Sequence, residues 1–349
     1  MPGPPNILVI KLSALGDIVQ AMSPAAAIRR HHDAARIVFL TTRPYGELAR
    51  KAPYFDDVWI DERPGWSDPV GLARLGRRLR EGQFDRVYDL QTRLRSSAYF
   101  WLMRLARGPE WSGTASGASH PHANPARDRM HTLDRQEDQL RMAGIPGPLP
   151  LPDLSWAAAD ISRFDLPRDY VLLIPGGAAH RPAKRWPIEN YAGLASRASA
   201  MGLAPVVIGG PSEVPLGKAI AAAAPETRDL TGQTEFGDIV ALARFARRAI
   251  GNDTGPMHLA VAGGAPATVL YSAASDPALT APRGRLAIFR PWASAAKFLS
   301  RLPPRVAGCR RVVHADRWQG LDPSDPAGHG RGFFVTSAPS ERRYRRSAR

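Results

Sequence analysis

The chain has 349 residues, and 44% of them are hydrophobic, which is enough for two domains of ordinary size with apolar cores. It contains no uninterrupted apolar run of about 18 residues, so the sequence predicts no membrane-spanning helix. The first residues lack the basic start and apolar stretch of a signal peptide, which favours a cytoplasmic location. The one cysteine, Cys309, cannot form an internal disulfide, and no Cys/His cluster has metal-ligand spacing. We therefore expect neither a metal nor another cofactor.

The net charge of +15 predicts attraction to anions such as nucleic acid, acidic lipid surfaces or phosphorylated substrates. The excess is spread along the chain and is heaviest at its end, where Arg342, Arg343, Arg345 and Arg346 form the one strong basic run. The richness in arginine and alanine also indicates a GC-rich genome, which weakens a functional interpretation of the charge. Nucleic-acid binding is therefore not expected to be the main role.

Short apolar runs alternate with helical patterns through the first part of the chain, as in a parallel α/β sheet. Residues 108–130 lack periodicity and are predicted to form a long surface loop. Residues 144–152 are rich in Gly and Pro and are the best candidate for a domain boundary. Strands are predicted at residues 7–10, 36–40, 58–60 and 86–90, and helices at residues 18–30, 45–51, 70–82, 95–107 and 132–143.

The same alternation restarts after this boundary. We therefore predict two α/β domains, residues 1–150 and 151–300, followed by a basic, irregular tail at residues 301–349. Ligands of open α/β sheets bind beyond the carboxyl ends of the strands, so the loops there should face a cleft between the domains. Strands are predicted at residues 170–174, 205–208, 248–250 and 267–271, the last of them the final clear strand, and helices at residues 188–201, 216–224 and 238–247.

The sequence G-N-D-T-G-P-M-H, which starts at Gly251, has the pattern of a strand end, a tight polar loop and a helix start. Pro256 suits the first helical position, and Thr254 or Asp253 could cap the free N–H groups. Gly255 would let the backbone approach a ligand closely. Such a helix start is a natural phosphate site, whereas a well-capped turn without a ligand is the alternative. This stretch alone does not decide between them.

Two further loops follow predicted strands. Asp17 is the only carboxylate in residues 13–17, and it would serve either as a helix N-cap or as a general base. Residues 175–187 concentrate cations. Lys184 could neutralise a diphosphate, and Arg181 or Arg185 could do so with a bidentate fork, although a solvated basic loop is the alternative. No loop has the pattern G-x-G-x-x-G or a P-loop, which disfavours a dinucleotide oxidoreductase and a nucleoside triphosphatase.

Four segments resemble motifs of the bacterial heptosyltransferases, glycosyltransferase family 9. In chain order they are K-L-S-A-L-G-D-I-V at residues 11–19, Y-D-L-Q-T-R-L-R-S-S at residues 88–97, P-G-G followed by K-R-W-P within residues 175–187, and N-D-T-G-P-M-H at residues 252–258. The last segment is the most specific of the four. The resemblance extends from about residue 6 to about residue 282.

The resemblance implies an α/β chain with the GT-B fold, two Rossmann-like domains facing across a cleft. It implies an inverting, metal-independent glycosyltransferase that transfers heptose from ADP-heptose to the inner core of lipopolysaccharide. The C-terminal domain would hold the donor, and the acceptor would approach the N-terminal domain at the inner face of the cytoplasmic membrane. The basic surface suits an anionic glycolipid and an anionic membrane face, so peripheral membrane contact is expected.

The same resemblance assigns roles to individual residues. Asp17 would take the proton from the acceptor hydroxyl, and Lys184 would stabilise negative charge on the departing ADP. His258 would have a supporting part. Donor contacts are expected from Arg181, Asp253, Thr254, Gly255, Pro256, Met257 and His258, and acceptor contacts from Ser13, Gln91 and Arg95.

Two alternatives stay open. Ser272 stands where the family usually has glycine, so another nucleotide-diphosphate sugar could be the donor. A basic protein without catalytic activity, which binds anionic glycolipid or nucleic acid, is the alternative from another class. It predicts that Asp17→Asn has no effect on function.

Overall fold

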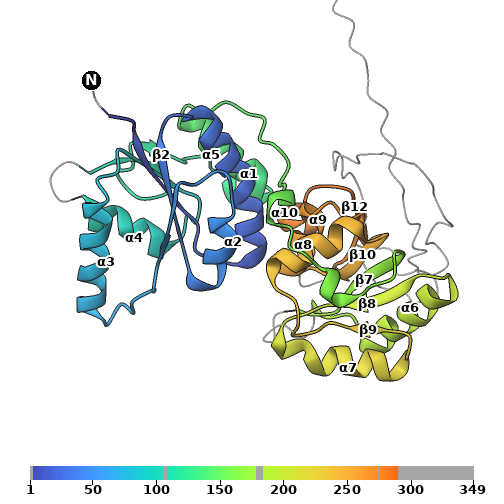
Figure 1. Ribbon diagram of the computed structural model, residues 1–349. Helices are drawn as coiled ribbons and strands as arrows, with labels where there is room; N and C mark the ends of the chain where they lie inside the picture. Colours follow the sequence, from blue (N-terminus) through green and yellow to red (C-terminus); the bar gives the residue numbers. More distant parts are fainter. Residues whose placement is uncertain (1–2, 105–107, 178–183, 273–274, 290–349) are drawn as a thin grey trace, which may run out of the picture. The chain divides into compact units, whose positions relative to one another are not determined.

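The computed structural model describes residues 3–104, 108–177, 184–272 and 275–289 (Figure 1). Within these residues the chain forms two six-stranded sheets. The predicted tail at residues 301–349 lies outside the described residues, as do Arg181 and Cys309.

The first sheet is parallel throughout and has the strand order β3-β2-β1-β4-β5-β6. The chain starts in the middle of the sheet, builds one edge, returns to the middle and then builds the other edge. This is the order of a doubly wound Rossmann sheet. Its strands are β1 (Asn6–Ile10), β2 (Arg36–Thr41), β3 (Asp57–Ile60), β4 (Arg86–Asp89), β5 (Glu110–Gly113) and β6 (His120–Pro121).

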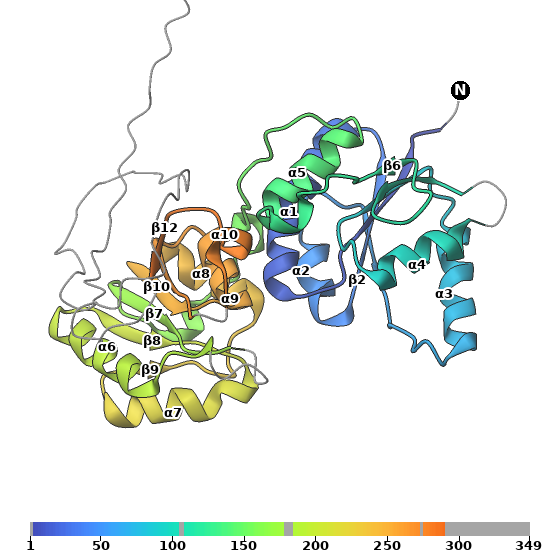
Figure 2. The same cartoon turned by 180° about the vertical axis from the view of Figure 1, so that it is seen from behind.

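Helices cover both faces of this sheet. Ile7 and Val9 of β1 pack in the core on the side of α1, whereas Leu8 and Ile10 pack in a second core on the side of α3 and α4. Because successive side chains of a strand point to opposite faces, both faces of β1 must be apolar. Figures 1 and 2 show α1, α2 and α5 on one side of the sheet and α3 and α4 on the other. The helices are α1 (Leu15–His31), α2 (Gly46–Arg50), α3 (Pro69–Glu81), α4 (Leu94–Met103) and α5 (Thr132–Met142).

The second sheet repeats the topology of the first. Its order, β12-β11-β10-β7-β8-β9, is again that of a doubly wound sheet, and all its strand pairs are parallel. Helix α8 packs against α9, and α6 packs against α7. The strands are β7 (Tyr170–Ile174), β8 (Ala204–Val207), β9 (Arg228–Asp229), β10 (Arg248–Asn252), β11 (Ala267–Leu270) and β12 (Leu286–Phe289). The helices are α6 (Ile188–Ala200), α7 (Val214–Ala223), α8 (Phe236–Phe245), α9 (Gly255–Ala262) and α10 (Pro277–Thr280).

Three local predictions were wrong. Residues 108–130 are not a continuous loop, because they contain β5 and β6. The strand at residues 267–271 is not the last, since β12 pairs with it in parallel. Helix α1 begins at Leu15 instead of residue 18, so Asp17 lies in its first turn. The missed strands are short and lie toward the sheet edges. They form by pairing with a neighbouring strand, and their sequences have no periodic pattern that would predict them.

The first turns of α1 and α9 are in close contact. A Cβ added to Gly16 would lie 2.8 Å from Cδ2 of His258, and one added to Gly255 would lie 2.7 Å from Cβ of Leu15. Both distances are shorter than real Cβ contacts, so this packing requires glycine at both positions. At Gly255, where the sequence predicted a close approach to a ligand, the structure shows a close approach to Leu15 of α1.

We expect Gly16→Ala to lower the free energy of unfolding by about 1–3 kcal/mol, because the added methyl must displace the His258 ring. The matched control is Gly193→Ala in α6, where a Cβ would meet nothing within 4 Å. That change should raise the free energy of unfolding by about 0.5–1 kcal/mol through better helix propensity. Chemical denaturation of the full-length protein measures both. Equal effects of the two changes would contradict the packing of α1 on α9.

Candidate functional site

In both sheets, the predicted loops lie where the strand order reverses. In the first sheet this switch point lies between β1 and β4, and in the second between β7 and β10. Ligands of open α/β sheets bind beyond the carboxyl ends of the strands at such points. The loop after β1 leads into α1, and the loop after β10 leads into α9. The fold therefore supports a candidate site built on the starts of these two helices.

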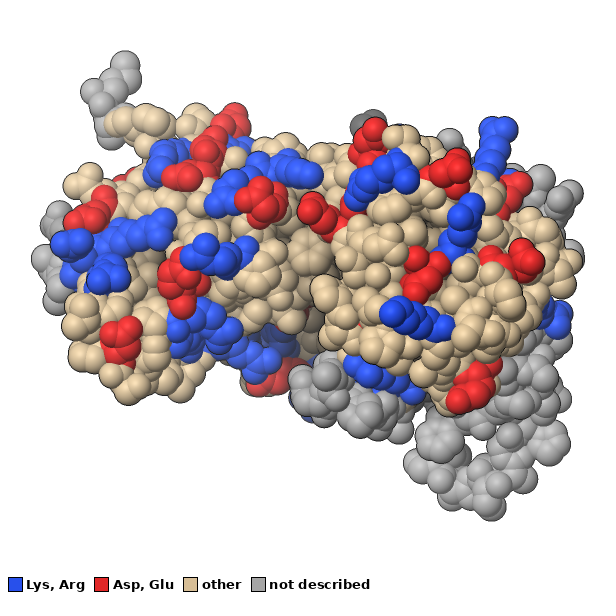
Figure 3. Space-filling view, turned by 60° about the horizontal axis from the view of Figure 1, so that its bottom comes forward, with Lys and Arg blue, Asp and Glu red and all other residues tan. Residues whose placement is uncertain are grey.

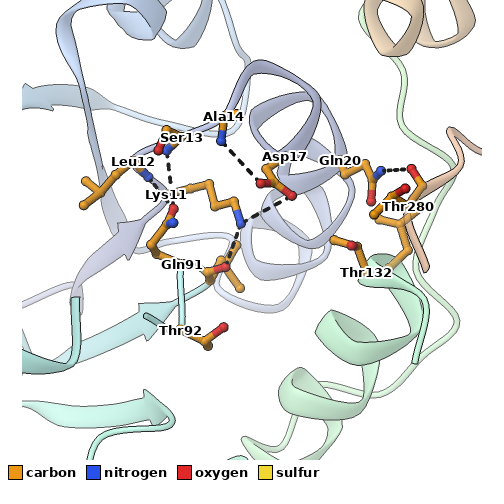
Figure 4. A network of polar contacts seen from close by, with 12 residues as sticks. Lys11, Leu12, Ser13, Ala14, Asp17, Gln20, Gln91, Thr92, Thr132 and Thr280 are labelled. Carbon is orange, nitrogen blue, oxygen red and sulfur yellow. Dashed lines mark hydrogen bonds and ion pairs between the residues drawn. The ribbon is translucent and has the colours of Figure 1, made fainter. Parts of the chain in front are cut away.

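Asp17 is the third residue of α1, and the N-cap is Ala14. Its Oδ2 accepts a hydrogen bond from the N–H of Ala14 at 3.3 Å, and its Oδ1 lies 4.0 Å from Nζ of Lys11. Figure 4 shows the Lys11 and Asp17 side chains pointing toward each other. The Asp17 side chain is 42% exposed, so a substrate hydroxyl can reach it.

Lys11 approaches Asp17 from the protein interior. Its side chain is only 5% exposed, and its Nζ donates to the carbonyl of Leu90 at 3.1 Å. Burial lowers the pKa of Lys11, the charge of Asp17 opposes that shift, and the charge of Arg135 adds to it. A buried ammonium needs partners, and here the carboxylate of Asp17 is one of them.

Gln91 joins the loop after β4 to the loop after β1. Its Oε1 accepts from the N–H of Leu12 at 2.9 Å and from that of Ser13 at 3.4 Å. Asp89 orders the start of the same segment, since its Oδ1 accepts from the N–H groups of Gln91 and Thr92. Burial raises the pKa of Asp89 to about 6, and among the described residues its Oδ2 has no hydrogen-bond partner.

Three guanidinium groups surround this end of the first sheet. Arg135 of α5 is partly buried, and burial together with the positive charges of Arg127 and Arg93 lowers its pKa, while Asp17 raises it. Arg127 pairs with Asp128, whereas Arg93 and Arg135 form no ion pair within the part of the chain that the structure describes. The region next to Asp17 therefore has spare positive charge for an anionic ligand.

In the second sheet, Asn252 at the end of β10 holds the neighbouring loops together. It is fully buried. Its Oδ1 accepts from the N–H of Trp186 and the hydroxyl of Tyr191, each at 3.1 Å. Its Nδ2 donates to the carbonyls of Pro175 at 2.8 Å and Gly176 at 3.1 Å. One amide therefore fixes the segment after β7 against the start of the α9 motif.

Of the cations predicted for a diphosphate, Lys184 and Arg185 are among the described residues and lie beside this motif. Lys184 forms an ion pair with Asp253 at 3.1 Å, with the two side chains 16% and 11% exposed. Arg185 donates to the carbonyl of Gly177 at 2.6 Å. Thr254 is the N-cap of α9, but its hydroxyl caps nothing and, among the described residues, is buried without a hydrogen-bond partner. The side-chain cap predicted at this position is therefore absent.

His258 braces the contact between α1 and α9. Its Nδ1 lies 3.2 Å from Nε2 of Gln20, and the same Nε2 lies 3.0 Å from the carbonyl of Thr280. Because that amide nitrogen donates to both, Nδ1 of His258 accepts and the ring carries its proton on Nε2. Burial lowers the pKa of His258 to about 4, so the ring is neutral at pH 7.

The described residues contain no group of three or more His, Cys, Asp or Glu side chains that could hold a metal ion. Among their helices, none is both long enough and apolar enough to cross a membrane.

Comparison with known proteins decides the family. The model of glycosyltransferase family 9 (heptosyltransferase) matches residues 72–298, which is more than half of the chain. This chain belongs to glycosyltransferase family 9. It is 33% identical over 309 residues to lipooligosaccharide heptosyltransferase 2 of Haemophilus ducreyi, covering 81% of this chain and 87% of the relative.

Solved structures agree with the fold. The structure of the Escherichia coli ADP-heptose lps heptosyltransferase II matches with a TM-score of 0.68 at 24% identity, covering 86% of this chain and 95% of that one. The E. coli heptosyltransferase WaaC with ADP also matches with a TM-score of 0.68, at 18% identity, covering 84% and 98% of the two chains. The predicted α/β GT-B fold is confirmed, and the chain is a glycosyltransferase.

The structure brings together some, but not all, of the site residues predicted for this glycosyltransferase. Ser13 and Gln91 lie beside Asp17, and the α9 motif lies against α1. Arg95 instead donates to the carbonyl of Pro64 at 2.9 Å and stacks 5.1 Å above the Trp66 ring. Arg181 cannot be placed, because it lies outside the described residues.

Lys11 and Asn252 lie inside predicted motifs, but sequence reasoning gave neither of them a role. A lysine directly after a four-residue apolar run is one sequence signal of such a role, because a charge at that position is buried unless the chain turns outward. An Asn at the end of an apolar strand is the corresponding signal in the second half. Neither signal identifies the backbone groups that these side chains bind.

The buried His258 predicts acid sensitivity. Its pKa is about 4 in the fold against an ordinary value of 6.5, so below pH 6.5 the unfolded chain binds the proton more strongly. The contribution of neutral, buried His258 to the free energy of unfolding is therefore fully present above pH 6.5 and is lost as the pH falls toward 4. His258→Asn keeps an acceptor for Gln20 but removes this titration. The destabilisation that it causes at pH 7 should shrink by up to about 3 kcal/mol at pH 4.

Urea denaturation across this pH range measures the effect. The raised pKa of Asp89 gives the free energy of unfolding a pH dependence of opposite sign. This effect is the same in wild type and variant, so it cancels in the difference between them. His31→Asn, at an exposed position of α1, is the control. A pH-independent difference between wild type and His258→Asn would show that the ring is not buried as described.

Proposed function

We propose that this glycosyltransferase transfers heptose from ADP-heptose to the inner core of lipopolysaccharide, with inversion at the anomeric carbon. The heptosyltransferase family supports the proposal, and so do relatives whose names describe lipopolysaccharide heptosyltransferases. One observation in the structure supports it most directly. The helix start that carries a lone accessible carboxylate packs against the helix start that carries the family's most specific motif.

Asp17 would act as the general base. As the acceptor hydroxyl attacks the anomeric carbon, its proton passes to the Asp17 carboxylate, and the bond between that carbon and the ADP oxygen breaks. Lys11 would hold the carboxylate from the buried side, which leaves the exposed side free for the acceptor. The hydrogen bond from Ala14 fixes the second oxygen, so the side chain has little freedom to turn away.

The donor would lie across the start of α9. Lys184 would share its charge between Asp253 and the diphosphate, and would stabilise the negative charge that develops on ADP as it leaves. The unpartnered hydroxyl of Thr254 and the N–H of Gly255 at the positive end of the helix would donate to phosphate oxygens. With these groups in place, the reaction does not call for a metal ion. Arg181, Pro256 and Met257 remain proposed donor contacts.

The acceptor would lie over the end of the first sheet. Ser13 and Gln91 border Asp17 there, and Arg127 and Arg135 provide positive charge. Negative groups on an inner-core acceptor would be held by these arginines and would keep the reacting hydroxyl beside Asp17. Because such an acceptor is attached to a lipid, we also propose that the enzyme works in the cytoplasm, in peripheral contact with the anionic inner face of the cytoplasmic membrane.

The test is release of ADP by the purified protein from ADP-heptose, with and without a core acceptor. We expect release that depends on the acceptor, and little release of UDP from UDP-sugars. Asp17→Asn should lower kcat by about 10²–10⁴-fold with an unchanged donor KM, because a general base acts only on the proton that is transferred in the chemical step. Unchanged turnover in Asp17→Asn would rule out this role, and UDP release in place of ADP would show another donor.

A double-mutant cycle with Lys11 is the control for positioning. Lys11→Met should lower kcat in the wild-type background, but it should have little further effect in the Asp17→Asn background, because the ion pair is already gone. Full additivity of the two losses would mean that Lys11 does not act through Asp17.

A further inference from the structure

Exposed large hydrophobic side chains gather on one part of the described chain. Eight such side chains are exposed, and four of them fall between residues 66 and 101, namely Trp66, Val70, Leu94 and Trp101, with exposed fractions of 57%, 66%, 81% and 57%. The other four are spread singly along the rest of the described residues. Isolated exposed apolar side chains are ordinary, whereas a group of this size on neighbouring elements indicates an interaction surface.

Helix α4 carries the centre of this group. Its inner side buries Tyr99, Phe100 and Met103 in the core beneath α3 and α4. Leu94 and Trp101 are seven residues apart, which is two helical turns, so they lie in line on the opposite side. Figures 1 and 2 show α3 and α4 together on one side of the first sheet. The helix is thus apolar both toward the core and toward the outside.

Arginines surround the apolar side chains. Arg95 lies 5.1 Å above the Trp66 ring, and Arg104 lies 5.2 Å from the Phe100 ring and 5.8 Å from the Trp101 ring. In the described chain Arg95 and Arg104 form no ion pair, and neither does the exposed Arg93. We call Trp66, Leu94, Trp101, Arg93, Arg95 and Arg104 the α4 patch.

Within the described residues, the nearby carboxylates form no ion pair with these arginines. Asp61 is buried and accepts from the hydroxyl of Tyr99 at 2.5 Å. Glu62 pairs with Arg43, and Asp68 caps α3 by accepting from the N–H of Gly71. The three acids therefore already have partners within the fold.

Charge is mixed over the face of the molecule that Figure 3 draws. In the space-filling view, basic and acidic side chains are interspersed over the visible face (Figure 3). Much of the net charge of +15 comes from residues 290–349, which contain 13 Lys and Arg against 4 Asp and Glu and lie outside the described residues. A uniformly basic surface therefore does not explain the α4 patch, which combines unpaired cations with exposed tryptophan and leucine.

We propose that the α4 patch docks the enzyme on an anionic lipid bilayer. Tryptophan and leucine enter the interfacial region of a bilayer, and arginine places its guanidinium at the level of the lipid phosphates. The patch also adjoins the acceptor side of the site, since Leu94 begins the helix that follows Gln91. The inference rests on the proposed function, because docking there would hold the enzyme where a lipid-linked acceptor presents its sugar.

The experiment uses the full-length protein and flotation with phosphatidylcholine vesicles, with or without phosphatidylglycerol. We expect binding to the vesicles that contain phosphatidylglycerol, weaker binding at high salt, and little binding to phosphatidylcholine alone. Replacing both apolar residues of α4, Leu94→Ser with Trp101→Ser, should weaken binding by about tenfold or more, because most of the inserted apolar area is lost.

The matched control is Phe245→Ser at the end of α8. Phe245 is 62% exposed, and Arg244 lies 6.0 Å above its ring, so the exposed aromatic with its arginine is reproduced away from α4. This variant should bind vesicles as the wild type does. The proposal would be overturned if both variants lost binding equally, or if the α4 variant bound vesicles as wild type does. It would also be overturned if the wild type formed concentration-dependent dimers that the α4 variant abolishes.

Folding and catalysis are checked separately. The α4 variant should keep the thermal unfolding midpoint of wild type and its rate of ADP release with a water-soluble core acceptor, because Leu94 and Trp101 are exposed and lie outside the hydrophobic cores. Vesicle binding needs no turnover. Failure of the docking proposal therefore shows in flotation, whereas failure of the proposed function shows in ADP release.

Discussion

The site depends on one steric constraint, the contact between the first turns of α1 and α9. Gly16 leaves room for the ring of His258, and Gly255 leaves room for Leu15. A methyl group at either glycine would separate the two helix starts. Asp17 follows Gly16 directly in the sequence, so the same contact fixes how far the proposed base lies from the donor motif. The side chains of His258 and Leu15 therefore set the spacing of the two helix starts.

Buried and partly buried polar side chains hold the loops beside these helix starts. Lys11 and Gln91 fix the segment around Asp17, and Asn252 fixes the segment that carries Lys184. Each of the three binds backbone groups of a loop that is distant in sequence, which explains why the polar residues Lys11 and Asn252 occupy buried positions at strand ends. Their hydrogen bonds give the loops defined conformations before a ligand arrives, and preorganised charge is the main means by which enzymes stabilise a transition state.

Sequence patterns predicted the central strands and most helices, because continuous apolar runs and helical periods mark elements that are buried on known faces. They failed for β5, β6, β9 and β12, which are two to four residues long and form only by pairing with a neighbour. The motifs predicted a candidate site at the strand ends, but they did not predict the roles of Lys11 and Asn252. Lys11 binds a carbonyl 79 residues away and Asn252 one 77 residues away, and no local pattern records such partners.

A crystal structure with a non-transferable fluorinated analogue of ADP-heptose would test the central claim, that the two helix starts form one reaction site. We expect the diphosphate to lie within hydrogen-bond distance of Lys184, the Thr254 hydroxyl and the N–H of Gly255. We also expect the anomeric carbon to face Asp17, with His258 still packed on Gly16. A diphosphate bound away from the start of α9, or an anomeric carbon turned away from Asp17, would contradict it.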